Sequence, residues 1–184
     1  MLDFLKGLRT PRAAVSPTPV SLLFLDVDGV LNSQATRENG DHMPAPELLD
    51  NLASIVRTTS SKIVLSSTWR LEGHSRHAVE HALASRNIKL LDSTADLTCR
   101  GDRVDEVLAW MTDHPEYAVQ AWIAVDDMDL IKMNSKLQAV NFVRTCDSVG
   151  LVTAKVTEAI RKLSAQQHLG SGAPSPSAHP RPGL

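Results

Sequence analysis

Residues 22–32 read LLFLDVDGVLN, an apolar run that ends in two aspartates two positions apart, with a glycine directly after the second. In a β-strand, side chains two positions apart point to the same face, so we expect Asp26 and Asp28 to project together where the strand ends. Gly29 allows the backbone to turn sharply just after them. Two carboxylates this close repel each other unless a proton or a cation lies between them. The pattern therefore indicates a divalent metal, acid–base chemistry or both.

The same stretch also fits a simpler interpretation, because an apolar run followed by Asp-Gly is a common signal for a strand that ends in a turn. Other strand ends in the chain favour the functional interpretation. Two further apolar segments end in polar pairs, KIVLSS in Ser66 and Ser67 and AWIAVDD in Asp126 and Asp127. Because three separate segments end in such side chains, we expect them to converge on one site.

Segments with strand and helix periods alternate along the chain. We expect strands at about 21–26, 62–67, 88–91, 121–125 and 141–145, and helices at about 45–58, 74–86, 102–112 and from Thr153 onward. This alternation predicts an α/β fold, a three-layer α/β/α sandwich with a mainly parallel, Rossmann-like sheet. In such sheets, ligands bind beyond the carboxyl ends of the strands, which is where the three polar pairs are expected.

The composition is that of an ordinary globular domain. Of 184 residues, 42% are hydrophobic and 22% are charged, which is enough apolar material for one core. The formal net charge of −2 gives no general attraction for nucleic acid or acidic membranes, and no apolar run reaches membrane-spanning length. We expect Cys99 and Cys146 to be small buried residues, in a protein from a reducing, cytoplasmic location.

The two ends differ in composition from the middle. Residues 1–19 combine basic residues with prolines and predict a flexible leader. A transit peptide is the alternative, but Asp3 and the short length argue against it. We expect the folded, catalytic domain at 20–166 and a disordered Gly/Ser/Pro tail at 167–184, since that composition buries too little apolar surface to order itself.

Together these motifs resemble those of the haloacid dehalogenase-like superfamily of phosphohydrolases, over about residues 20–165. LFLDVDGVLN is similar to the first motif of that family, IVLSSTWR to the second and WIAVDD to the fourth. The SSTWR ending, the Arg100-Gly101 helix entry and the GLVTAKV segment also resemble the cap-poor phosphatase domains of RNA-repair proteins. The resemblance implies a fold of the predicted class without a substantial cap domain.

The resemblance implies an Mg²⁺-dependent phosphomonoester hydrolase that forms an aspartyl-phosphate intermediate. Asp26 would be the nucleophile, and Asp28 would protonate the leaving-group oxygen and then deprotonate the attacking water. Mg²⁺ would be held by the Asp26 carboxylate, the Asp28 backbone carbonyl and Asp126 or Asp127, all oxygen ligands that suit a hard cation. Dehalogenation is disfavoured, because that branch of the superfamily lacks the second acid.

The groups that would bind phosphate are less clearly defined by the resemblance. Ser66 would donate a hydrogen bond to a phosphate oxygen, with Ser67 as the competing choice. The lysine of the family's third motif is missing, because the corresponding region reads TCRGDRVDE. Arg100 is the preferred substitute, since it is cationic and lies just before a helix, and Arg103 is a second choice, with a solvent-facing side chain as its alternative. Arg70 could clamp phosphate through two hydrogen bonds.

The spacing of the motifs predicts an open site. About 38 residues separate Asp28 from Ser66, and one helix and a turn account for most of them. The remainder, NSQATRENGDHM, is long enough for a flap but not for a domain. An open site admits a small phosphorylated molecule, a nucleic-acid end or a phosphoprotein, and Trp69 is the tryptophan placed to touch such a substrate. The oligomeric state stays open.

The missing lysine also motivates a second hypothesis from another functional class. A domain that kept the acids but lost the catalytic cation would be a non-catalytic module, which binds Mg²⁺ or phosphate and recruits partners through the Pro-rich tail. Trapping an aspartyl-phosphate mimic with beryllium fluoride or vanadate would favour the enzyme, and the loss of both binding and turnover would favour the module.

Overall fold

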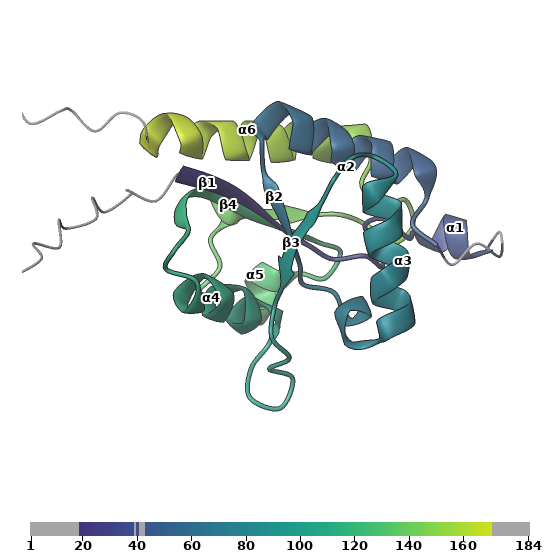
Figure 1. The fold of residues 1–184 in the computed structure, drawn as a ribbon, viewed down its shortest axis with the longest axis horizontal. Coiled ribbons are helices and arrows are strands. Elements are labelled where there is room, and N and C mark those ends of the chain that lie inside the picture. Colours follow the sequence, from purple (N-terminus) through teal and green to yellow (C-terminus); the bar gives the residue numbers. More distant parts are fainter. Residues whose placement is uncertain (1–18, 39, 41–42, 171–184) are drawn as a thin grey trace, which may run out of the picture.

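The computed structural model describes residues 19–38, 40 and 43–170, and a five-stranded β-sheet in the order β3-β2-β1-β4-β5 forms its centre (Figure 1). The strands are β1 (Pro19–Leu25), β2 (Lys62–Leu65), β3 (Leu90–Ser93), β4 (Ala118–Asp126) and β5 (Phe142–Arg144). Every neighbouring pair is parallel. The predicted α/β fold with a Rossmann-like sheet is confirmed.

Helices cover both faces of this sheet (Figure 1). They are α1 (Gln34–Glu38), α2 (Pro46–Thr59), α3 (Gly73–Ala84), α4 (Arg103–Asp113), α5 (Leu130–Met133) and α6 (Thr153–Gly170), with short 3-10 helices η1 (Thr68–Leu71) and η2 (Ala139–Asn141). Helices α2, α3 and α6 pack on one face, and α4 and α5 pack on the other. Along β1, Leu23 and Leu25 face the first layer and Leu22 and Phe24 the second, as the two-residue period of a strand requires.

The start of α4 is fixed by the predicted cap residue, Asp102. Its Oδ1 atom accepts hydrogen bonds from the backbone N–H groups of Val104 at 2.9 Å and Asp105 at 3.1 Å. The Asp105 carboxylate in turn accepts from the Asp102 N–H at 3.3 Å, which completes a capping box. This cap places Arg103, the first residue of the helix, beside the carboxyl edge of the sheet.

Several predicted boundaries need correction. Strand β3 begins at Leu90, two residues later than expected, and Pro19, assigned to the leader, begins β1. Residues 167–170, assigned to the disordered tail, are the last residues of α6, because Gln167 is bonded to the Ser21 hydroxyl and the Thr59 carbonyl. The rest of the leader and of the tail lies outside the described residues.

The described residues contain no separate cap domain. Between β1 and β2 they form only α1 and α2, and between β2 and β4 they form η1, α3, β3 and α4. These elements belong to the sandwich itself or to short connections at its edge. The expectation of a fold without a substantial cap is confirmed for this part of the chain.

Both cysteines contradict the expectation of buried positions. Cys99 and Cys146 are exposed free thiols. Cys99 lies in the turn that leads toward α4, and Cys146 directly follows the short stretch after β5. Connecting segments run over the surface, so these positions offer no apolar pocket for a thiol.

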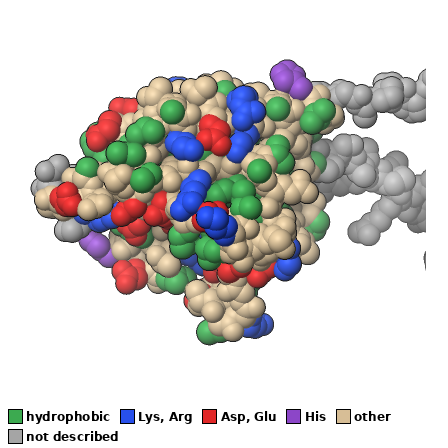
Figure 2. Space-filling view, turned by 180° about the vertical axis from the view of Figure 1, so that it is seen from behind, with side chains coloured by type: hydrophobic (Ala, Val, Ile, Leu, Met, Phe, Trp, Pro, Cys, Tyr) green, Lys and Arg blue, Asp and Glu red, His purple; other side chains and the backbone are tan. Residues whose placement is uncertain are grey.

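The described surface is mixed in character. Figure 2 shows basic, acidic and hydrophobic side chains interspersed over one face of the molecule, in keeping with the small net charge. Among the described helices, none is both long and apolar enough to cross a membrane.

Candidate active site

Three of the predicted acids come together at the carboxyl edge of the sheet. Asp26 follows β1, and Asp126 and Asp127 lie at the end of β4, the strand that pairs with β1 up to Leu25 and Val125. One carboxylate oxygen from each acid lies within 4.8 Å of the others. The convergence predicted for the strand ends that carry acids is therefore present in the structure for Asp26, Asp126 and Asp127.

The turn after β1 needs glycine for two reasons. Gly29 has a φ of +69°, in the left-handed region that other residues rarely adopt. A Cβ atom there would also lie 2.5 Å from Cγ of Asp127, much closer than any ordinary contact. The carbonyl of Val27 accepts hydrogen bonds from the backbone N–H groups of Val30, Leu31 and Asn32, at 3.2, 2.8 and 2.9 Å. The glycine predicted to allow the turn thus also makes room for an acid of the cluster.

Arg103 is the cation that faces these acids. Its Nη1 atom lies 2.9 Å from Oδ1 of Asp26 and 2.8 Å from Oδ2 of Asp126. Burial opposes the charge of Arg103, but the negative charges of Asp26 and Asp126 outweigh it and raise the pKa of the guanidinium above its ordinary value. Arg103 therefore stays charged between two of the acids.

Arg100 was the preferred substitute for the missing lysine, but the structure does not place its side chain beside the acids. Arg100 is exposed in the turn before α4, and the described residues contain no ion pair between it and the acid cluster. Side chains in the first turn of a helix lean toward its N-terminus. Because α4 starts at Arg103, that side chain points back over the sheet edge, and of its two alternatives the structure shows the contact with the acids and not the solvent-facing one.

The acid cluster carries more negative charge than Arg103 can balance. Burial, with a further contribution from the charge of Asp26, raises the pKa of Asp126 from 3.8 to about 7, although Arg103 works in the opposite direction. Burial also raises the pKa of Asp127, again with help from Asp26. Both shifts therefore come first from burial and second from the neighbouring negative charge, and Arg103 does not offset the two together at Asp126.

The donor set fits a hard divalent cation. Arg103 contacts one carboxylate oxygen of Asp26 and one of Asp126. The other carboxylate oxygen of Asp126 accepts a hydrogen bond from the backbone N–H of Met128 at 2.9 Å. Each carboxylate oxygen has two lone pairs, so all three acids keep acceptor capacity for an ion. Carboxylate oxygens are also the ligands that Mg²⁺ prefers.

Asp28 lies apart from this group and is held by two donors. Nε1 of Trp69 donates to its Oδ2 at 2.8 Å, and Nδ2 of Asn32 donates to its Oδ1 at 3.1 Å. The side chain is half-buried. The structure thus separates the two acids of the DVDG stretch, because Asp26 contacts Arg103 and Asp28 contacts neutral donors. Trp69, expected to touch substrate, donates to one of the acids of the site.

The two serines of the second motif differ in how they are used. Both are buried. The hydroxyl of Ser67 caps η1 by accepting from the N–H of Trp69 at 3.4 Å. In the described part of the chain the Ser66 hydroxyl has no hydrogen-bond partner, so it is the one left for a ligand. This geometry favours Ser66 over Ser67 as a phosphate contact.

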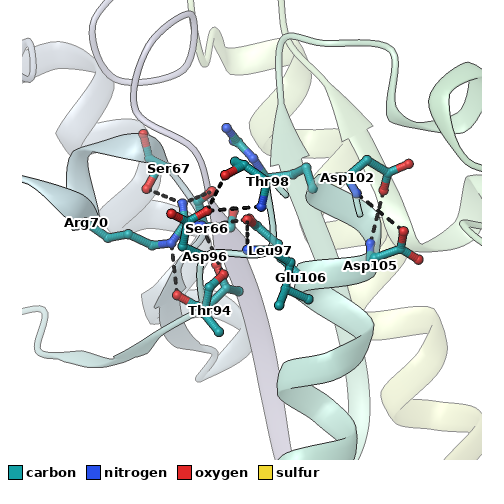
Figure 3. Close-up of polar contacts among 12 residues, drawn as sticks. Ser66, Ser67, Arg70, Thr94, Asp96, Leu97, Thr98, Asp102, Asp105 and Glu106 are labelled. Atoms are coloured by element: carbon teal, nitrogen blue, oxygen red, sulfur yellow. Dashed lines mark hydrogen bonds and ion pairs between the residues drawn. The ribbon is translucent and has the colours of Figure 1, made fainter. Parts of the chain in front are cut away.

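Arg70 is buried in a network of its own (Figure 3). Its guanidinium lies 2.8 Å from Glu106 and donates to the carbonyls of Thr94, Ser67 and Ala95 at 2.9, 2.7 and 3.1 Å. The side chains of Arg70 and Glu106 are only 3% and 4% exposed. Arg70 therefore ties η1 to β3 and α4, and it does not face the acid cluster as a phosphate clamp would.

A cavity of about 290 Å³ lies next to Arg103. Its lining includes Thr68 from η1, Arg103 from α4, Met128 after β4 and Met133 from α5. These elements follow three different strands, so the cavity opens at the edge where the acids lie. Its walls combine the charged side chains of Arg70, Arg103 and Glu106 with the thioether side chains of the two methionines.

Sequence reasoning missed three partners of the site. Asn32 and Trp69 hold Asp28, and Glu106 neutralises Arg70. One signal was available for Asn32, since it follows Asp28 by four residues across a predicted turn. The contacts of Trp69 and Glu106 join segments 41 and 36 residues apart, with no local pattern to reveal them.

The parallel sheet, the acid cluster at its carboxyl edge and the lack of a separate cap domain among the described residues define a haloacid dehalogenase-like (HAD) phosphohydrolase domain. The chain matches the family described as "HAD domain in Swiss Army Knife RNA repair proteins" over residues 22–156, and it belongs to this family. No curated protein matches the chain. The family assignment confirms the resemblance carried by the motifs.

Proposed function

We propose that this protein is an Mg²⁺-dependent phosphomonoester hydrolase that acts through an aspartyl-phosphate intermediate. The observation that carries the proposal is the cluster of Asp26, Asp126 and Asp127, with Arg103 on two of the three acids. Packing does not require buried carboxylates with raised pKa values, and such groups concentrate at functional sites. Arg103 also weakens the argument for a non-catalytic module. That argument rested on the missing lysine of the third motif, and Arg103 places a cation beside the acids.

In the first step, a carboxylate oxygen of Asp26 attacks phosphorus while the bond from phosphorus to the leaving oxygen breaks. The leaving oxygen takes a proton from Asp28 and departs as an alcohol. In the second step, water attacks phosphorus and gives one proton to Asp28. The bond from Asp26 to phosphorus then breaks, which releases phosphate and restores both acids.

The remaining residues bind and balance charge. Arg103 offsets the charge of Asp26 as the anionic phosphoryl group approaches. Ser66 donates to a phosphoryl oxygen. Asp26, Asp126 and Asp127, together with the carbonyl of Asp28, would hold Mg²⁺, which supplies positive charge for the phosphoryl oxygens.

The nucleophile is tested with Asp26→Asn on p-nitrophenyl phosphate, with Mg²⁺ and with EDTA. We expect the variant to lose more than about 10³-fold in kcat/KM, because an amide cannot form the phosphoenzyme. EDTA should abolish wild-type turnover. The matched control is Asp113→Asn, an exposed acid at the far end of α4, which should behave as wild type. Equal activity of Asp26→Asn and wild type would exclude this nucleophile.

We further propose a bulky substrate such as a nucleic-acid end. The site has no cap domain over it in the described residues, and the family's description refers to RNA repair. A panel of 3′- and 5′-phosphorylated oligonucleotides, mononucleotides and phosphopeptides tests this, and we expect kcat/KM to be at least about 10-fold higher for one oligonucleotide end. Equal rates for mononucleotides would contradict the proposal.

The free thiols of Cys99 and Cys146 fit a reducing compartment, for which we propose the cytoplasm.

A further inference from the structure

We infer that Trp69 is a positioning residue whose indole N–H fixes the carboxylate of Asp28 for proton transfer. The inference rests on the proposed function and adds a residue that the family motifs do not assign. Its basis is the 2.8 Å hydrogen bond from Nε1 of Trp69 to Oδ2 of Asp28. This bond joins residues 41 positions apart, one after β1 and one on the short helix after β2.

The Asp28 carboxylate is held at both oxygens. Trp69 binds Oδ2, while Nδ2 of Asn32 donates to Oδ1 at 3.1 Å. The position of Asn32 is itself fixed, because its N–H donates to the Val27 carbonyl at 2.9 Å and its carbonyl accepts from the Gly29 N–H at 2.9 Å. With one donor on each oxygen, the carboxylate plane has a single orientation.

The indole is also held firmly. Trp69 packs against the core on the α2, α3 and α6 side of the sheet. The backbone N–H of Trp69 donates to the Ser67 hydroxyl oxygen at 3.4 Å. The next residue, Arg70, anchors η1 through its ion pair with Glu106 and its bonds to backbone carbonyls. The Arg70–Glu106 pair therefore supports Trp69, and through it Asp28.

The chemistry of the two donors leaves Asp28 free to carry a proton. An indole N–H can only donate, so it takes one lone pair of Oδ2 and never competes as an acceptor. Asn32 takes one lone pair of Oδ1, which leaves one lone pair on each oxygen. In the first step the proton on such a lone pair goes to the leaving oxygen as its bond to phosphorus breaks. In the second step a water proton returns to the same carboxylate.

The dependence on the leaving group separates positioning from mere structural support. An alkoxide is a poor leaving group and needs a proton, whereas p-nitrophenolate leaves without one. Trp69→Phe keeps an aromatic ring and removes the N–H. We expect it to lower kcat for an alkyl ester such as glycerol 2-phosphate by about 10- to 100-fold, and for p-nitrophenyl phosphate by less than about 3-fold. The Mg²⁺ concentration needed for half activation should not change.

Trp110→Phe is the matched control. Nε1 of Trp110 donates to Oδ2 of Asp92 at 2.7 Å, so this variant also removes a hydrogen bond from an indole to an aspartate, but away from the acid cluster. We expect it to affect both esters equally. If Trp69→Phe folds poorly, replacing Trp69 by β-(3-benzothienyl)alanine removes the N–H and keeps the shape of the ring.

A double variant completes the test. Because Trp69 acts through Asp28, adding Trp69→Phe to Asp28→Asn should cost nothing further for the alkyl ester. Equal losses on both esters from Trp69→Phe, or additive losses in the double variant, would overturn the positioning role while leaving the phosphatase intact. A wild-type protein that hydrolyses neither ester and no member of the phosphorylated panel would instead overturn the proposed function, and this inference with it.

Discussion

Arg70 and Arg103 reach the same edge of the sheet from different elements, but their surroundings differ in charge balance. Arg70 meets one carboxylate, Glu106, and several backbone carbonyls, all almost fully buried. Arg103 shares one nitrogen between Asp26 and Asp126, and Asp127 adds a third acid within reach. A buried charge that is balanced and fully bonded stabilises structure. A cluster that keeps an excess of one sign is suited to bind a ligand of the other sign.

The largest effect is expected for folding, when the balanced pair is broken. Arg70→Met leaves the Glu106 carboxylate buried without its cation and frees the carbonyls of Thr94 and Ala95. Breaking a buried pair in this way costs about 3–5 kcal/mol of the free energy of unfolding. Urea denaturation in EDTA measures it.

The double variant Arg70→Met/Glu106→Leu is the control for this prediction. With both charges removed, much of the lost stability should return, since apolar replacement of a buried pair is often neutral. If the single Arg70→Met variant were as stable as wild type, the Arg70–Glu106 pair would not stabilise the fold. Arg70 and Arg103 would then no longer differ in role as described above.

The next effect is on catalysis. Arg103→Met removes the cation beside the nucleophile, and we expect kcat/KM for p-nitrophenyl phosphate to fall by about 10²- to 10³-fold, the usual cost of one group that stabilises transition-state charge. Arg103→Lys keeps the charge and should retain most of the activity. If Arg103→Met lowered stability as much as Arg70→Met but spared turnover, the roles of the two arginines would have to be exchanged.

The contrast in charge balance also predicts a dependence of stability on pH. The pKa of Asp126 is 3.8 in its ordinary state and about 7 in the folded protein. Between these values the folded state binds more protons than the unfolded state, so the free energy of unfolding in EDTA should fall as pH rises. The loss should be absent below about pH 4 and complete above about pH 7.

Urea denaturation at about pH 5 and about pH 7.5 measures this loss, and Asp126→Asn is the variant in which it should largely vanish. Saturating Mg²⁺ should also reduce it, since a cation that binds the folded state offsets the repulsion. Stability in EDTA that rises over this range would mean that burial and the charge of Asp26 do not raise the pKa of Asp126.

The same contrast separates what was predictable from the sequence from what was not. Asp26, Asp126 and the parallel sheet could be predicted, because apolar runs ending in acids have a local pattern and alternating strands and helices are typical of parallel sheets. The partner of Arg70 could not, since Glu106 lies among the apolar residues of α4 and its burial depends on tertiary packing. The choice between Arg100 and Arg103 required knowing that α4 begins at Arg103, and helix boundaries are the least certain part of a pattern.

The smallest effect is expected at the arginine that the sequence favoured. Arg100 is exposed in the turn before α4, and no ion pair joins it to the acids in the described residues, so Arg100→Ala should change the free energy of unfolding by less than about 0.5 kcal/mol. Turnover of p-nitrophenyl phosphate should stay within about 2-fold of wild type, because a screened surface charge contributes little. A loss as large as that of Arg103→Met would mean that the turn closes over the bound substrate and brings Arg100 to the phosphoryl group. Comparing Arg100→Ala with Arg103→Met on an oligonucleotide and on the aryl ester distinguishes the two cases, since a surface arginine that only contacts a nucleic-acid backbone would alter KM for the oligonucleotide alone.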